Sequence, residues 1–335
     1  MTESPITCTI DLAAIGRQVG RLQVPRSSNT AGWASTVIPI VNVARGEGPS
    51  VLVLGGNHGD EYEGQVAALN LARELQPEQV SGRVTIVPVL SVEASRAGTR
   101  LWPSGANFNR SFPGSPEGTA AEQLADFLTR SLIPAADVVI DMHSGGTSTV
   151  FMVCSHMHVV DDPEQRRRML DGMLAWNTDH HFLYIDVAGS GLLPVEAERQ
   201  GKTVVTTELG GGGHVLAETH RVAQDGLANV LRWAGALEGE ARTRDDAVIL
   251  DGRDARNYVF APESGVFEAL APIGRQVAAG EPIGRIHFIE RPDRAPEVIE
   301  APLAGTICGT RAISNTLQGD NVVILGQPID RAQLV

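Results

Sequence analysis

Apolar residues follow two different periods between residues 35 and 240. Short apolar and β-branched runs, which are typical of strands, alternate with longer stretches in which apolar residues recur at helical spacing. Several strand-like runs, such as VLVL and VVI, have no polar face, as expected for strands buried on both sides. We therefore predict an α/β fold with a parallel or mixed sheet and helices on both faces. The predicted strands are 35–43, 51–56, 83–90, 136–146, 148–155, 181–187 and 202–213, and the predicted helices are 63–75, 120–132, 163–176 and 219–237.

The two ends of the chain depart from this pattern. Residues 1–50 contain one alternating run, so we predict an irregular arm followed by a single strand there. Beyond residue 240 the helical periodicity disappears, and short strand-like runs are separated by Gly and Pro. We predict a catalytic α/β domain over 1–240 and a small all-β domain, a barrel or sandwich, over 245–335.

Composition limits the classes of partner. The formal net charge of −13 argues against a nucleic-acid partner, because phosphate binding requires a basic face. No apolar run reaches the ~18 residues of a membrane span, and the N-terminus lacks the pattern of a signal peptide. Cys8, Cys154 and Cys308 are too widely spaced for a disulfide framework or a Cys-based zinc motif. We expect a cytoplasmic protein that binds no membrane.

Three of the predicted strands end in polar, glycine-rich turns. Their sequences are GGNHGDEYEG, DMHSGG and TTELGGGG, at 55–64, 141–146 and 206–213. In open α/β sheets, ligand sites form outside the carboxyl ends of the strands. We therefore expect these three turns to converge on one cleft.

The first two turns supply candidate metal ligands. His58 and Glu61 are separated by two residues, and Gly59 between them allows both side chains to face one point. His143 would add a second imidazole from the neighbouring strand. Two imidazoles, one carboxylate and a water molecule are a recurrent catalytic zinc set. We predict Zn²⁺ on these three side chains. Cobalt or manganese would suit the same donors, and the alternative is that both histidines are capping residues in glycine loops.

The third turn and a polar loop supply candidate catalytic and substrate-binding groups. A carboxylate at the position of Glu208 is costly unless it is used or paired, and Glu208 can act as general base and then general acid. In the NFNRSFPG loop, the planar fork of Arg110 suits a carboxylate or a developing oxyanion, and Asn109 can form hydrogen bonds beside it. The alternatives are a Glu208 paired with an arginine and an Arg110 that binds local carbonyls. Arg96 and Arg100 are weaker candidates for the same role.

We predict no direct metal binding or catalysis for Asp141 and the remaining histidines. Asp141 precedes His143 by two residues and can orient that imidazole. The remaining histidines have no convincing ligand spacing, and we predict surface or core roles for them: His156, His158, His180, His181, His214, His220 and His287.

Taken in order, GGNHGDEYEG, NFNRSFPG, DMHSGG and TTELGGGG resemble the succinylglutamate desuccinylase/aspartoacylase family, which is related in fold to the zinc carboxypeptidases. The resemblance covers residues 35–240 strongly, and the C-terminal β region also has a family counterpart. It implies a carboxypeptidase-like mixed sheet and a zinc-dependent amidohydrolase. It further implies zinc on His58, Glu61 and His143, an acid/base role for Glu208, and substrate contacts by Asn109 and Arg110.

Within the family, GGNHGDEYEG, RSFPG and VTTELGGGG are most similar to deacetylases that act on N-α-acetyl-L-2,4-diaminobutyrate in ectoine degradation. The resemblance thus implies the products acetate and 2,4-diaminobutyrate. Aspartoacylases typically have Gly-x-His-Gly-Asn-Glu, Asp-Leu-Asn-Arg and Glu-Val-Gly, from which Phe108 and the run of four glycines depart. A diaminobutyrate side chain is an ammonium, so its pocket needs carboxylates or carbonyls. Glu63, Asp186 and Glu196 are candidates, and the sequence does not choose among them.

The sequence is also compatible with other functions. The chain is also compatible with a desuccinylase or aspartoacylase-type deacylase of another acyl-amino acid, with a carboxypeptidase-like metallopeptidase, or with a non-catalytic metal- or ligand-binding protein of the same fold. The β region would narrow the cleft, which favours a small acyl-amino acid as partner, or it would serve as an interaction module. Homo-oligomers are common among such enzymes, and one is possible here.

Overall fold

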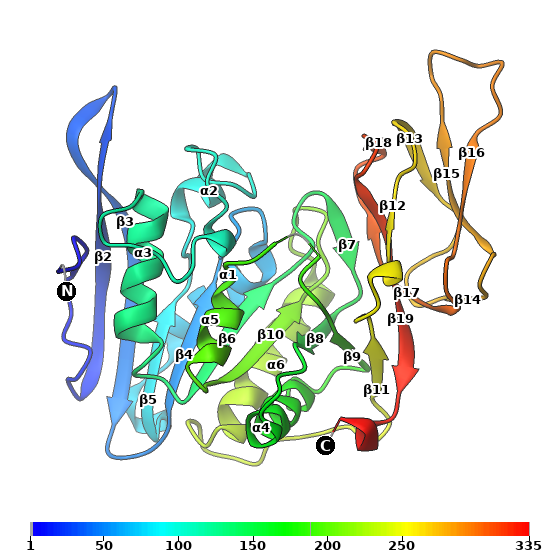
Figure 1. Ribbon diagram of the computed structural model, residues 1–335. Coiled ribbons are helices and arrows are strands. Elements are labelled where there is room, and N and C mark those ends of the chain that lie inside the picture. The colour runs from blue at the N-terminus through cyan, green and yellow to red at the C-terminus, as the bar shows by residue number, and fades with distance from the viewer. Residues whose placement is uncertain (1–2, 188, 335) are drawn as a thin grey trace.

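The computed structural model describes residues 3–187 and 189–334. Figure 1 shows one continuous sheet that crosses the molecule, with helices against it and a second small sheet at the C-terminal end. The helices are α1 (Tyr62–Glu74), α2 (Val92–Ala97), α3 (Ala120–Phe127), α4 (Pro163–Leu174), α5 (Leu193–Arg199) and α6 (Ala217–Trp233). In the part of the chain up to residue 208, the strands are β1 (Thr7–Cys8), β2 (Gly16–Ser28), β3 (Ala31–Arg45), β4 (Ser50–Gly55), β5 (Gly82–Val87), β6 (Val138–His143), β7 (Thr149–Phe151), β8 (Cys154–Met157), β9 (His180–Leu183) and β10 (Thr203–Glu208). Beyond it they are β11 (Val248–Asp251), β12 (Tyr258–Phe260), β13 (Gly265–Ala269), β14 (Gln276–Val277), β15 (Pro282–His287), β16 (Glu297–Glu300), β17 (Gly305–Arg311), β18 (Asn315–Thr316) and β19 (Asn321–Ile329).

The centre of the large sheet is parallel. Strands β5, β4, β6 and β10 lie side by side in that order, and each runs parallel to its neighbour. Gly55 lies opposite Met142, and Glu208 lies opposite His143. All residues of β6 are buried, because both faces of the sheet are covered. The carboxyl ends of β4, β6 and β10 therefore meet at one edge, as the sequence predicts.

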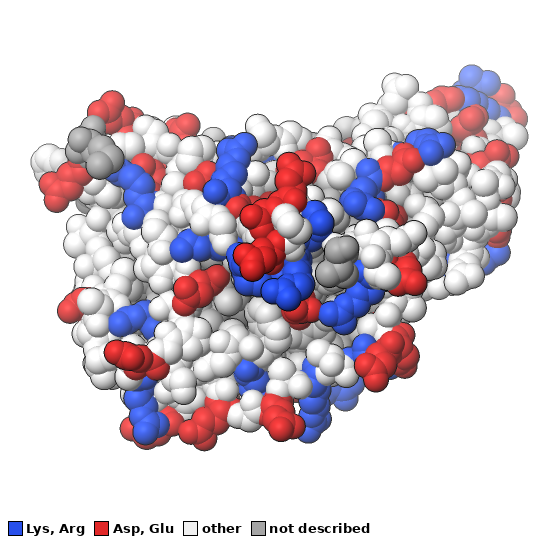
Figure 2. Space-filling view, turned by 60° about the horizontal axis from the view of Figure 1, so that its bottom comes forward, with Lys and Arg blue, Asp and Glu red and all other residues white. Residues whose placement is uncertain are grey.

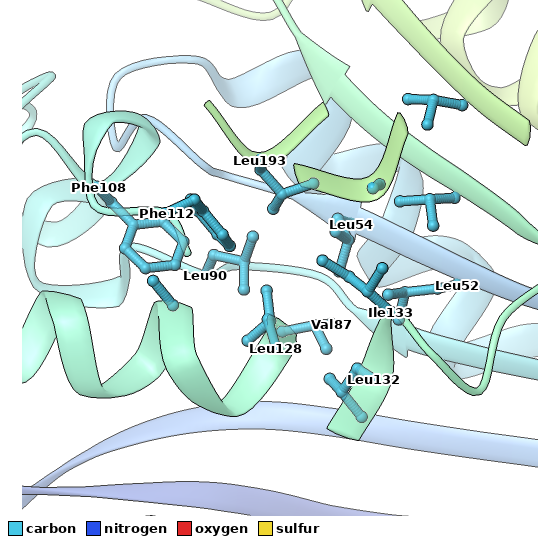
Figure 3. Close-up of a cluster of buried hydrophobic side chains, with 14 of the residues drawn as sticks. Leu52, Leu54, Val87, Leu90, Phe108, Phe112, Leu128, Leu132, Ile133 and Leu193 are labelled. Carbon is cyan, nitrogen blue, oxygen red and sulfur yellow. The ribbon is translucent and has the colours of Figure 1, made fainter. Parts of the chain in front are cut away.

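Helices cover both faces of this sheet, as predicted, and β4 shows how the sequence assigns its side chains to them. Leu52 and Leu54 pack on one face with Leu128, which follows α3, and with Leu193 of α5 (Figure 3). Val53 belongs to the core of the other face, which α1 and α6 cover. Successive strand residues point to opposite faces, so an entirely apolar run fills two cores at once.

The prediction for residues 1–50 is wrong. Instead of an arm and one strand, β2 and β3 form a long antiparallel hairpin with Gly16 opposite Ala44, which reaches beyond the body of the protein (Figure 1). Few apolar side chains of β2 are buried: Leu22 and Val24 in the middle of the strand are fully buried, whereas Val19 is 62% exposed. A largely solvated strand near the edge of a sheet carries too few apolar residues for the pattern to reveal it.

The prediction of one strand over 148–155 is also wrong. The chain bends between β7 and β8, so β7 pairs with β17 and β8 pairs with β10. The short helices α2 and α5 lie in stretches for which no helix was predicted, since one or two turns give too little periodicity. In the described residues, no helix is both long and apolar enough to cross a bilayer.

The C-terminal part is all β, as predicted. Strand β11 pairs in parallel with β9, and β19 and β17 follow, so these strands extend the large sheet. The separate antiparallel sheet has the order β16-β15-β13-β18. Its strands share a core with β17 and β19, which includes Phe267, Ile283 and Leu325.

Candidate active site

The predicted metal ligands come together at the carboxyl edge of the sheet. His58 lies in the loop after β4, Glu61 immediately precedes α1, and His143 ends β6. The Nδ1 atoms of His58 and His143 lie 2.7 and 2.8 Å from the two carboxylate oxygens of Glu61. Candidate ligand atoms of the three side chains all lie within 4.8 Å of one another, and all three residues are buried.

Glycine allows the loop after β4 to approach the rest of the protein this closely. A Cβ atom on Gly59 would lie 2.3 Å from the backbone carbon of Ala94 in α2. Gly56 has a φ of +63°, in the left-handed region that favours glycine. The two glycines therefore let His58 and Glu61 turn toward β6.

Neighbouring polar groups fix the orientation of the cluster. Asp141 accepts from Asn57 at 3.0 Å and lies 2.9 Å from His143 Nε2, so it orients that imidazole as predicted. Arg100 donates to Glu61 Oε1 at 2.9 Å. Arg100 was predicted only as a weaker candidate for the role of Arg110, and its contact with Glu61 was not predicted.

The protonation states of the cluster are coupled through its charges. Burial lowers the pKa of His58. Burial acts in the same direction on His143, but the carboxylates of Asp141 and Glu61 outweigh it and raise the pKa of His143 well above its usual range. For Glu61 burial is likewise outweighed, and the two imidazoles hold the pKa of its carboxyl well below the usual range.

This donor set fits a divalent metal ion. Two imidazoles and a carboxylate are the protein ligands of a recurrent type of catalytic zinc site. In the described part of the chain, the buried Nε2 atom of His58 has no hydrogen-bond partner. A cation would also compensate the negative charge that Glu61 and Asp141 bring into the interior.

Glu208 lines the same cavity as the three candidate ligands. Its Oε2 atom is buried, and no described residue forms a hydrogen bond with it. Burial, followed by the negative charge of Glu61, raises the pKa of Glu208 to about 8. Cations near Glu61 oppose this repulsion, so a bound metal would shift the pKa of Glu208 downward.

The NFNRSFPG loop places Asn109 and Arg110 in the cavity wall. Phe108 and Phe112 are buried and anchor the loop in the core (Figure 3). The Oδ1 atom of Asn109 accepts from the backbone N–H of Leu193 at 2.8 Å, which ties the loop to the start of α5. Arg110 donates from one guanidinium nitrogen to the Asn109 carbonyl at 2.7 Å. Burial lowers the pKa of Arg110, although nearby Asp186 opposes that effect.

The cavity has a volume of about 350 Å³, which suits a small molecule. Besides the residues described above, its wall includes His156, Tyr184 and Asp186 from the region of β8 and β9, and Tyr258 and Ile324 from the C-terminal part. A surface or core role was predicted for His156; the residue is buried, and burial lowers its pKa to about 3. Its place in the cavity wall was not predicted, because only its position after the bend at β8 brings it there.

The structure separates the three carboxylates proposed for an ammonium group. Asp186 lines the cavity, whereas Glu63 and Glu196 are absent from its wall. Glu63 is buried and accepts from the backbone N–H of Gly211 at 3.1 Å. Glu196 is half-buried in α5 and accepts from Gln200 at 2.9 Å. On the face shown in Figure 2, Lys and Arg side chains are interspersed with Asp and Glu.

A buried His-Glu-His cluster beside a carboxylate, at the carboxyl edge of a mixed α/β sheet, defines a class of protein. The chain belongs to the succinylglutamate desuccinylase/aspartoacylase family: the model of that family's catalytic domain matches residues 47–234. This match confirms the resemblance found in the sequence.

Individual relatives cover nearly the whole chain. It is 39% identical over 98% of its length, and 96% of the relative, to the N-alpha-acetyl-L-2,4-diaminobutyric acid deacetylase of Halomonas elongata. The product-bound structure of the ectoine utilization protein EutE from Ruegeria pomeroyi superposes with a TM-score of 0.94, at 36% identity, over 98% of this chain and 100% of that one. A succinylglutamate desuccinylase/aspartoacylase from Rhodobacter sphaeroides gives 0.93, at 38% identity and the same coverage. The C-terminal β region is therefore shared with these relatives.

Proposed function

We propose that this protein is a zinc-dependent deacetylase that hydrolyses N-α-acetyl-L-2,4-diaminobutyrate to acetate and 2,4-diaminobutyrate. The observation that carries the proposal is the 39% identity over 98% of the chain to a deacetylase of that substrate. The cavity agrees with it, since it holds a metal-ligand set, a carboxyl group and an arginine in a space for a small molecule.

We propose His58, Glu61 and His143 as the residues that hold the metal. Zinc bound there would polarise the amide carbonyl and make a water molecule more acidic. Asp141 keeps the His143 ring in position by accepting from its other nitrogen. The large number of buried charges in this cluster requires such mutual compensation.

We propose Glu208 as general base and then general acid. Its carboxylate accepts a proton from the attacking water and afterwards donates that proton to the leaving nitrogen. The Arg110 guanidinium stabilises negative charge that develops on the carbonyl oxygen. Because it has five donors, Arg110 also contacts the substrate carboxylate, with Asn109 beside it.

We also propose that the two parts of the chain contribute differently to the active site. Residues 1–240 carry all of the proposed catalytic groups, and residues 245–335 close one side of the cavity with Tyr258 and Ile324.

We further propose that the protein acts in the cytoplasm, because Cys154 and Cys308 are buried as free thiols, the usual state in a reducing compartment.

Metal analysis combined with a product assay tests the proposal. We expect about one zinc ion per chain and release of acetate from N-α-acetyl-L-2,4-diaminobutyrate, lost on chelation and restored by zinc. His143→Ala should lose stoichiometric zinc and activity together, whereas the exposed His214→Gln should keep both. Acetate release that persists in metal-free protein would contradict the zinc requirement. Faster turnover of succinyl or peptidyl amides in the same panel would contradict the substrate.

A further inference from the structure

Among the carboxylates that line the cavity, one has no role in the proposed chemistry. The wall contains three acidic residues, Glu61, Asp186 and Glu208. Glu61 belongs to the candidate metal cluster, and Glu208 stands opposite His143 at the end of β10. Asp186 lies in the loop after β9, outside that cluster.

Asp186 is the outer, solvent-exposed member of a partly buried chain of charged groups. Its Oδ1 atom lies 3.5 Å from Nε2 of His158, and Nδ1 of His158 lies 3.0 Å from Oε1 of Glu198 in α5. The His158 ring also packs against Tyr184, with 3.9 Å between ring centroids. With His158 protonated, this chain of two carboxylates and one imidazolium keeps a net charge of −1 at the cavity wall.

Asp186 also lies near Arg110, which we propose as a contact of the substrate carboxylate. The charge of Asp186 acts on the Arg110 guanidinium, and both line the cavity. An Nα-acylated diamino acid carries a carboxylate on its α-carbon and an ammonium a few bonds away. A cation and an anion side by side in one wall are complementary to that pair of charges.

We propose that Asp186 determines specificity by binding the side-chain ammonium of the substrate, with His158 and Glu198 as positioning residues behind it. This inference rests on the proposed function and adds the group that recognises the cationic side chain. A carboxylate that is pre-oriented by neighbours loses less conformational freedom on binding. It also rejects an anionic side chain in the same place, because like charges repel.

A charge-matched pair of substrates tests the inference. N-α-acetyl-L-2,4-diaminobutyrate and N-acetyl-L-norvaline have side chains of similar size, and only the first is charged. We expect Asp186→Asn to lower the ratio of their kcat/KM values by roughly 10- to 100-fold, the effect of losing one charge-assisted hydrogen bond. Asp186→Glu should retain most of the preference. Glu196→Gln, which removes a carboxylate outside the cavity, should leave the ratio as in the wild type. A ratio that changes less than threefold in Asp186→Asn would overturn the role of Asp186.

Binding measurements separate this inference from the proposed function. By calorimetry, wild-type protein should bind L-2,4-diaminobutyrate more tightly than L-norvaline, and Asp186→Asn should lose that preference. If no acyl-amino acid is hydrolysed but the preference depends on Asp186, the proposed reaction fails and the recognition site stands. If the cationic substrate is deacetylated but wild-type protein binds both amino acids equally, the reaction stands and the recognition site is overturned. Circular dichroism and thermal unfolding confirm that the variants are folded.

Discussion

At the scale of single residues, Glu208 carries the sharpest prediction about chemistry. Glu208→Gln preserves the shape of the side chain but removes its ability to exchange a proton. We expect kcat to fall at least about 100-fold, in the range for loss of general acid–base catalysis, with zinc content unchanged. Steady-state assays and metal analysis on the same sample measure both. A variant that keeps more than a tenth of the wild-type kcat would show that another group moves the proton.

His158 gives a prediction about pH and stability. Burial opposes its charge, but contacts with Asp186 and Glu198 raise the pKa of His158 to about 9, above its ordinary 6.5. The stabilisation from these contacts is therefore complete below pH 6.5 and is lost as the pH rises through 9. We expect the contribution of His158 to the free energy of unfolding to fall by about 3 kcal/mol as the pH rises from 6.5 to 9.

Urea unfolding at pH 6.5 and pH 9 measures this dependence. His158→Gln should have a smaller difference between the two pH values than the wild type, and the exposed His214→Gln should keep the wild-type difference. Equal differences in wild type and His158→Gln would mean that His158 is not charged in the folded protein.

Candidate site residues could be predicted from the sequence where they lie close together in one motif. His58 and Glu61 lie three residues apart beside glycines, and that spacing indicated the metal cluster that the structure brings together with His143. The partnership of Asp186 with His158 and Glu198 could not be predicted. Those residues are separated by up to 40 positions and meet only through the packing of α5 against the sheet.

At the scale of elements, the close approach of α1 to β6 controls the geometry of the metal cluster. A Cβ atom on Gly64 of α1 would lie 2.6 Å from the Cβ of Met142 in β6. The helix begins directly after Glu61, and β6 ends at His143, so pushing the two elements apart separates two candidate ligands. We expect Gly64→Ala to lower the free energy of unfolding by roughly 1–3 kcal/mol, as overpacking does, and to weaken zinc binding.

Denaturant unfolding and zinc titration with a competing chelator test this effect. Gly32→Ala is the matched control, because no atom lies within 4 Å of a Cβ at that position in β3. It should change neither quantity. Weakened stability with unchanged zinc affinity would show that the cluster tolerates movement of α1.

Elements differ in how well the sequence reveals them. The predicted helix 63–75 and buried strand 51–56 match α1 and β4 closely, because each has a long or wholly apolar signal. The hairpin of β2 and β3 was missed for the opposite reason, since most of its outer face is solvated. Strand β7 was merged with β8 because the bend between them lies within one apolar run, and tertiary pairing with β17 decides where it falls.

At the scale of the whole molecule, the C-terminal strands complete the cavity that the α/β part begins. Ile324 of β19 lies in its wall, although it is far in sequence from every proposed catalytic residue. Removing part of this side chain enlarges the cavity without touching the charged groups. We expect Ile324→Ala to raise kcat/KM for longer acyl groups, such as succinyl, relative to acetyl by roughly tenfold, the scale of a few methylene groups in a pocket. Val298→Ala, on an exposed part of β16, is the matched control. A relative preference that stays as in the wild type would mean that the C-terminal strands support the fold of the cavity but do not select the substrate.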